Sequence, residues 1–153
     1  MIQHVWSVLC TKSVVDKETN NISLIEVLEQ VSVVGPPVPE RERGVIPINC
    51  ELVTLWSRSR DNQPARGRAR VTLRGPSGEV VVNQESEVDL SVYPRTRVRW
   101  MWTVIPFREP GCQTIGVELR VEGEAEWRDV SKVPLHIMLE PPESSQGMSS
   151  SPI

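Results

Sequence analysis

The run Arg97-Val-Arg-Trp-Met-Trp-Thr-Val-Ile-Pro-Phe107 decides the fold class, because its side chains alternate between polar and apolar with the two-residue period of a β-strand. The run Thr114-Ile-Gly-Val-Glu-Leu-Arg-Val-Glu122 repeats this alternation, and the Pro110-Gly111 pair between the two runs is a turn signal. The pattern therefore predicts a β-hairpin with two tryptophans on its buried face. The side chains expected to point inward are Val98, Trp100, Trp102, Val104, Ile115, Val117, Leu119 and Val121.

Turn sequences divide the rest of the chain into further segments with strand-like patterns. Clusters of glycine, proline, asparagine and aspartate separate these segments, and such clusters are typical of the turns between strands. The polar cluster at residues 16–21 predicts a hairpin between the first two strands. The expected strands cover residues 2–12, 22–34, 45–59, 68–74, 79–92 and 127–139.

Residues 22–34 allow two interpretations. Ser23 and Glu26 resemble a helix capping box, and a helical stripe runs through Leu24, Leu28 and Val31. The β-branched run at the end of the segment instead fits a strand that contains a bulge. The strand is favoured because every neighbouring segment is predicted to be β.

These patterns predict an all-β protein, an antiparallel β-sandwich of about seven to nine strands of immunoglobulin-like or C2-like type. A chain of 153 residues has the size of one domain, which we assign to residues 1–140. The proline- and serine-rich residues 141–153 have the composition of a disordered tail.

Composition and cysteine usage predict a soluble cytoplasmic protein. The chain is 24% charged and 39% hydrophobic, which is typical of globular domains. Its three cysteines are an odd and widely spaced set, whereas a secreted disulfide framework usually has an even number. The N-terminal residues lack the pattern of a secretion signal, and no apolar run is long enough for a membrane-spanning helix.

Arginine is concentrated in the middle of the chain. Residues 68–74 and 95–99 present arginines on one strand face each, and the strand between them presents Glu85, Glu87 and Asp89 opposite the inward Val88, Leu90 and Val92. If the three strands form a meander, an acidic strand lies between two basic ones and forms a ladder of ion pairs, which is the favoured reading. The alternative is a polyanion-binding face, for which the candidate residues are Arg68, Arg70, Arg97 and Arg99. Nucleic acid is disfavoured, because Trp100 and Trp102 are expected to point into the core rather than toward bases.

No motif indicates catalysis or a bound metal. Catalysis would need two histidines and three cysteines to converge from distant positions, and none has the spacing of a zinc site. The loop at residues 16–21 has too few carboxylates for calcium. We therefore predict no enzymatic activity, no cofactor and no metal, with a metal- or thiol-dependent hydrolase as the alternative. The residues that such a hydrolase would use are His4, His136, Cys10, Cys50 and Cys112.

Three stretches carry a resemblance to a known family. The run from Cys10 to Gln30, the turn Gly75-Pro-Ser-Gly78 and the Pro110-Gly111 turn are similar to features of a bacterial family of small uncharacterised all-β domains. The resemblance covers residues 5 to about 139 and implies a β architecture and a bacterial origin. That family has no assigned activity, so it implies no catalytic residue.

The function predicted from the sequence is that of a non-catalytic binding or interaction module with a protein partner. Self-association is one form of this prediction, because a sandwich has edge strands that can pair across a two-fold axis. Strands 2–12 and 45–56 are apolar on both faces and are the expected interface. No membrane partner is expected.

Overall fold

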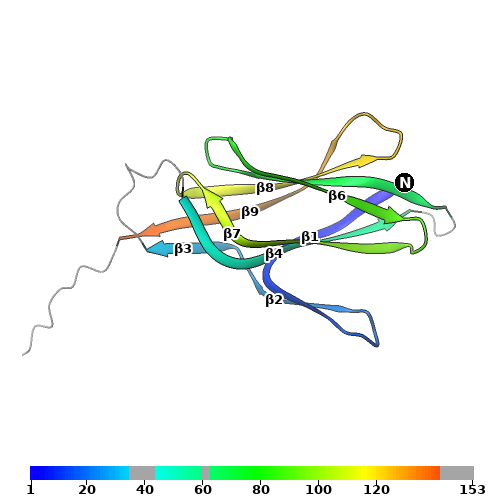
Figure 1. The fold of residues 1–153 in the computed structure, drawn as a ribbon, viewed down its shortest axis with the longest axis horizontal. Helices are drawn as coiled ribbons and strands as arrows, with labels where there is room; N and C mark the ends of the chain where they lie inside the picture. Colours follow the sequence, from blue (N-terminus) through cyan, green and yellow to red (C-terminus); the bar gives the residue numbers. More distant parts are fainter. Residues whose placement is uncertain (35–43, 60–62, 142–153) are drawn as a thin grey trace, which may run out of the picture.

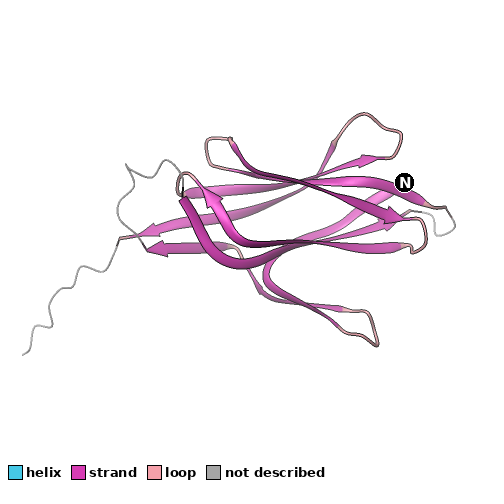
Figure 2. Cartoon of the chain, in the orientation of Figure 1, coloured by secondary structure: helices cyan, strands magenta, loops and turns pink. Residues whose placement is uncertain are grey.

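Every regular element in residues 1–34, 44–59 and 63–141, which the computed structural model describes, is a β-strand (Figure 2). The nine strands form two sheets that pack face to face (Figure 1). The predicted all-β sandwich is therefore confirmed. The strands are β1 (Ile2–Val15), β2 (Ile22–Val27), β3 (Gln30–Val34), β4 (Gly44–Arg58), β5 (Ala65–Arg74), β6 (Val80–Leu90), β7 (Arg95–Phe107), β8 (Gly111–Val121) and β9 (Arg128–Glu140).

The strand order is β2-β1-β4-β7 in a four-stranded sheet and β3-β9-β8-β5-β6 in a five-stranded sheet. Neighbouring strands are antiparallel except for β3 and β9, which are parallel. The strands at the sheet edges are β2, β7, β3 and β6. The predicted tail, apart from residue 141, lies outside the described residues.

The predicted hairpin between the two central runs is wrong. β7 pairs with β4 at the edge of the four-stranded sheet, whereas β8 lies between β9 and β5 in the other sheet. The turn after Phe107 carries the chain across the sandwich. Gln113 holds this crossing, because its buried amide donates hydrogen bonds to the carbonyls of Glu109 and Gly111. Alternation indicated the inner face of both runs correctly up to Trp102 and along β8, but two strands facing one core need not be hydrogen-bonded to each other.

Val104 also departs from its predicted orientation. It is 41% exposed, while the next residue, Ile105, is buried with Phe107. The pairing with β4 shifts by one residue between Pro47 and Cys50, which is the signature of a β-bulge. β7 reverses its faces across this irregularity, where Thr103 has no register partner, so Trp102 is the last inward residue of the first pattern. Val92, also predicted inward, lies beyond the end of β6 and is exposed.

Residues 22–34 form strands rather than a helix, and they form two strands instead of one. β2 pairs with β1 in a hairpin, as predicted, and β3 joins β9 in the opposite sheet. Glu26 has a φ of 53°, which ends the regular pairing of β2, and the buried Leu28 lies at the crossing. The tip of the hairpin is closed by Asp16, whose side chain accepts hydrogen bonds from two backbone N–H groups.

β1 pairs with two different partners along its length. Its first part lies beside β4 as far as Cys10, and its remaining residues pair with β2 in a hairpin that projects from the body of the sandwich (Figure 1). Arg97 of β7 holds the tip of this hairpin by donating hydrogen bonds to the main-chain and side-chain oxygens of Asn20, at 2.8 and 2.9 Å. Because β1 leaves β4 at Cys10, residues 44–50 of β4 pair with β7 alone.

The core consists of the apolar side chains on the facing sides of the two sheets. The four-stranded sheet contributes Leu9, Leu52 and Trp56, and the Trp56 indole donates a 2.8 Å hydrogen bond to Thr54. The five-stranded sheet contributes the fully buried Ala69, Val71, Val88, Leu90, Val117, Leu119, Leu135 and Ile137.

Replacing Leu52 with alanine should lower the free energy of unfolding by about 2–5 kcal/mol, because the side chain is fully buried between the sheets and the cavity cannot close. Chemical denaturation followed by tryptophan fluorescence measures the change. Val92→Ala is the control, since Val92 is 73% exposed and its truncation should change stability by less than about 0.5 kcal/mol. Equal losses in the two variants would contradict the position of Leu52.

Candidate functional site: the charged sheet faces and the edge of β7

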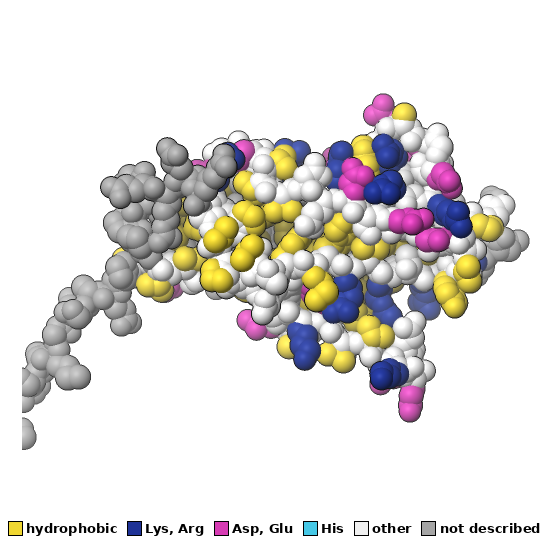
Figure 3. Space-filling model, in the orientation of Figure 1, with side chains coloured by type: hydrophobic (Ala, Val, Ile, Leu, Met, Phe, Trp, Pro, Cys, Tyr) yellow, Lys and Arg dark blue, Asp and Glu magenta, His cyan; other side chains and the backbone are white. Residues whose placement is uncertain are grey.

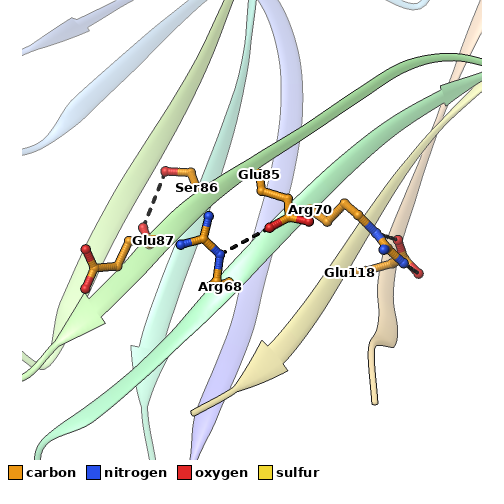
Figure 4. Close-up of polar contacts among 6 residues, drawn as sticks. All are labelled: Arg68, Arg70, Glu85, Ser86, Glu87 and Glu118. Carbon is orange, nitrogen blue, oxygen red and sulfur yellow. Dashed lines mark hydrogen bonds and ion pairs between the residues drawn. The ribbon is translucent and has the colours of Figure 1, made fainter. Parts of the chain in front are cut away.

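Ion pairs run across the outer face of the five-stranded sheet, between β5 and its two neighbours (Figure 4). Arg66 pairs with Asp89 at 3.5 Å, and Arg68 pairs with Glu85 at 3.2 Å. These contacts agree with the predicted pairing between the first basic strand and the acidic strand. They are exposed, and each contributes at most about 1 kcal/mol.

Arg70 makes the best-formed ion pair on this face. Its Nε and a terminal guanidinium nitrogen donate to the two carboxylate oxygens of Glu118, at 2.6 and 2.9 Å. The hydrogen bonds from Arg70 hold the pKa of Glu118 below its ordinary value. Arg70 therefore pairs with an acidic side chain of β8, a strand that the sequence pattern predicted beside β7.

Trp127 adds an interaction that sequence reasoning missed. The guanidinium carbons of Arg70 and Arg120 lie 4.3 and 4.8 Å from the centre of its ring, within the range of a cation–π interaction. Trp127 was expected to begin the last strand, but it lies one residue before β9, and the strand pattern did not indicate a contact with the arginines.

The second basic strand does not complete the predicted meander. β7 belongs to the other sheet, so Arg97 and Arg99 lie on the opposite side of the sandwich from Arg68 and Arg70. The four candidate anion-binding arginines thus divide into two pairs, and each contacts an oxygen of the chain itself. A depression of about 470 Å³ beside Arg68 is lined by three arginines and three glutamates, and this mixed charge does not favour a polyanion.

Glu51, which pairs with Arg99, is the most buried carboxylate among the ion pairs of the described residues. Glu51 is only 3% exposed, and one of its oxygens accepts a 2.8 Å hydrogen bond from Arg99. Burial alone raises the pKa of Glu51, but the hydrogen bond and the charge of Arg99 outweigh that effect and lower it. This carboxylate is therefore a charged group whose ionisation stabilises the fold.

Replacing Glu51 with glutamine should lower the free energy of unfolding at neutral pH by about 1–2 kcal/mol, an effect limited by water around the half-exposed Arg99. Because the folded pKa is depressed, this contribution is present above the unfolded carboxyl pKa of about 4.3 and is lost as pH falls through the folded pKa. The difference between the native chain and the variant should therefore shrink below about pH 4. Urea denaturation between pH 3 and 7 measures it. The exposed Glu87→Gln is the control, and a difference independent of pH would contradict the assignment.

The cysteines and histidines considered for catalysis do not converge. Cys10 and Cys50 are buried. Burial is the main cause that raises the pKa of Cys50 to about 11, and the neighbouring Cys10 and Glu51 add to it. The Cys50 thiol therefore stays protonated at neutral pH. His4 lies beside Ser7 and Trp56 at one sheet, whereas His136 is the cross-strand neighbour of the exposed Cys112 in the other. Within the described ranges, no three His, Cys, Asp or Glu side chains are placed to bind a metal ion, and no helix long and apolar enough to cross a membrane occurs.

The native protein should react rapidly with Ellman's reagent at one thiol, that of Cys112, because the other two are buried. Absorbance should show one equivalent in the fast phase and three after unfolding in guanidinium. Cys112→Ser should remove the fast phase. Rapid reaction of a second thiol in the folded protein would contradict the burial of Cys10 and Cys50.

The edge strand β7 carries a run of eight uncharged residues, 100–107. In Figure 3, hydrophobic side chains gather over the left and centre of the view, whereas most charged side chains lie toward the right. Met101 and Val104 are 69% and 41% exposed, and Val45 of the adjoining β4 is 64% exposed. We call the exposed side chains of this region the β7 patch; it consists of Val45, Pro47, Met101, Thr103 and Val104.

A narrow apolar crevice borders the β7 patch where β6 approaches β7. Val82, Trp102 and Val104 line it together with core residues, and its volume of about 10 Å³ is too small to admit a side chain. The indole of Trp102 donates a 3.0 Å hydrogen bond to the side chain of Gln84 on β6. The two strands belong to different sheets, so among the strands of residues 1–34, 44–59 and 63–141 none pairs with the outer edge of β7 beside this crevice.

Comparisons with known proteins leave the family of this chain open. No family model matches the sequence, and no curated protein matches it. Among solved structures, the chain is similar to the N-terminal domain of PorA, with 10% sequence identity over 88% of this chain and 98% of that one. The TM-score is 0.28, so the likeness carries no functional argument.

Proposed function

We propose that this protein is a non-catalytic interaction module that binds an uncharged, extended polypeptide segment along the free edge of β7. The observation that carries the proposal is the uncharged run at residues 100–107 on an edge strand. A free edge presents a row of unpaired N–H and C=O groups, which can pair with a strand of another chain.

Edge strands are commonly protected from such pairing by charged side chains. The first part of β7 has this protection in Arg95, Arg97 and Arg99, and the edge strand β6 has it in Glu85 and Glu87. Residues 100–107 have no charged side chain, and Pro106 is near the end of the run. The unprotected part of the edge therefore extends from Trp100 to Ile105.

Side chains on both sides of this edge can contact an added strand. Met101 and Val104 are exposed on the outer side, and Val45 extends the same apolar surface over β4. The crevice with Val82 and Trp102 lies toward β6. In strand addition, main-chain hydrogen bonds supply affinity, and contacts with exposed side chains such as Met101 and Val104 supply selectivity. The uncharged β7 patch disfavours a charged partner segment, because the charges of that segment would lose their hydration without gaining an ion pair.

The β7 patch supports the proposal better than the surface expected from the sequence. The middle residues of the two strands that are apolar on both faces, such as Cys10 and Val53, are already buried within the single chain. The buried thiols of Cys10 and Cys50 and the separation of His4 from His136 give the hydrolase alternative less support. The arginine pairs leave the polyanion alternative without a specific observation in its favour.

A photoactivatable benzoylphenylalanine placed at Val104 should cross-link to a polypeptide in cells and give an adduct of one defined mass. The same probe at Val14 is the matched control, because Val14 is equally exposed, at 45%, but lies in the β1–β2 hairpin. Met101→Lys in the same chain should abolish the Val104 adduct, since it places a charge in the β7 patch. Equal cross-linking at both positions, or none at either, would overturn the proposed function.

A further inference from the structure

We infer that the polypeptide bound at the edge of β7 is β7 of a second copy of this chain, paired antiparallel across a two-fold axis. This inference rests on the proposed function and names its partner. Its product is one continuous sheet of eight strands, made from two four-stranded sheets joined at β7. The reasons are the symmetry of strand pairing, the charge of the edge, and the properties of the other edges.

Strand pairing between identical edges needs no second binding surface. An antiparallel pair is symmetric, so each β7 supplies both the donor and acceptor groups that the other lacks. The same operation places Met101 and Val104 of one copy near those of the other, so the exposed apolar side chains on the two chains cover one another.

The distribution of charge along β7 permits this pairing. Eight residues of an antiparallel strand span about 27 Å, which is long enough for a pair that stays inside the neutral run. Arg99 at one end is held by Glu51 of its own chain, and Arg108 lies beyond the other end. Pairing centred on residues 100–105 places Arg99 of one copy opposite the uncharged Pro106 of the other. Arg97, which would face Arg108 beyond the paired residues, is held by Asn20 of its own chain.

The other edge strands in the described part of the chain are less suited to self-pairing. Glu26 has a positive φ that interrupts β2, and β3 is only five residues long. β6 carries its acidic side chains along half of its length. The uncharged run of β7 is the longest among these four edges, so it is the surface that a second copy would use.

Sedimentation velocity of the purified full chain, from about 1 to 200 μM, should show a species of twice the chain mass that grows with concentration. Val104→Lys should raise the dimer dissociation constant at least tenfold, because it places two like charges in the paired edge. Val14→Lys, the control of matched exposure, should leave it unchanged. Met101→Glu tests the same surface independently, and circular dichroism verifies that each variant is folded.

Hydrogen exchange locates the interface. Backbone amides in residues 100–105 should gain protection as protein concentration rises, whereas those of β2 should not. A chain of single mass at all concentrations, or equal weakening by Val104→Lys and Val14→Lys, would overturn the inference. The proposed function would survive that outcome if the Val104 probe in cells still formed an adduct with a different polypeptide, identified by the mass of the adduct. The absence of both the dimer and the adduct would overturn the inference and the proposed function together.

Discussion

The burial of two apolar sheet faces against each other is the constraint on which the rest of the structure depends. Leu52 and Trp56 on one sheet and Leu119 and Leu135 on the other are fully excluded from water, and each fully buried side chain of this size contributes about 1.5–3 kcal/mol. This requirement explains why β7 and β8 lie in opposite sheets. A chain that crosses between the layers turns the apolar faces of both runs toward the same core, and a polar outer face remains on each side.

The charged residues follow from that arrangement. On the five-stranded sheet they lie on the outer face, where Arg68 and Arg70 reach acidic side chains of neighbouring strands. On the four-stranded sheet, Arg99 of β7 pairs with Glu51 of β4, and Arg97 holds the tip of the projecting β1–β2 hairpin. The arginine-rich segment is thus divided between two faces of the molecule. Its ion pairs contribute mainly to the position of the strands, and the candidate for binding lies elsewhere.

The proposed binding edge arises from a local break in the strand pattern. The bulge opposite Pro47 reverses the face of β7 after Trp102, so Val104 is exposed while Ile105 enters the core. β1 has already left β4 at Cys10, which leaves β4 and β7 as a two-stranded ribbon in this region. Exposed apolar side chains, an uncharged sequence and a free strand edge therefore occur together, and their combination distinguishes this part of the surface from the charged sheet faces.

The sequence by itself determined the all-β class, the strand positions, the β1–β2 and β5–β6 hairpins and the inward side of most strands. These properties depend on interactions between residues close in the chain, because alternation and turn residues act locally. Only the tertiary structure decided that β7 pairs with β4, that residues 22–34 divide between the sheets, and that Arg99 pairs with Glu51. A two-residue period specifies which side of a strand is apolar but not which strand lies beside it, and a one-residue bulge changes even the side. The partners of each strand, and with them the free edge of β7, follow from how the whole chain closes one core.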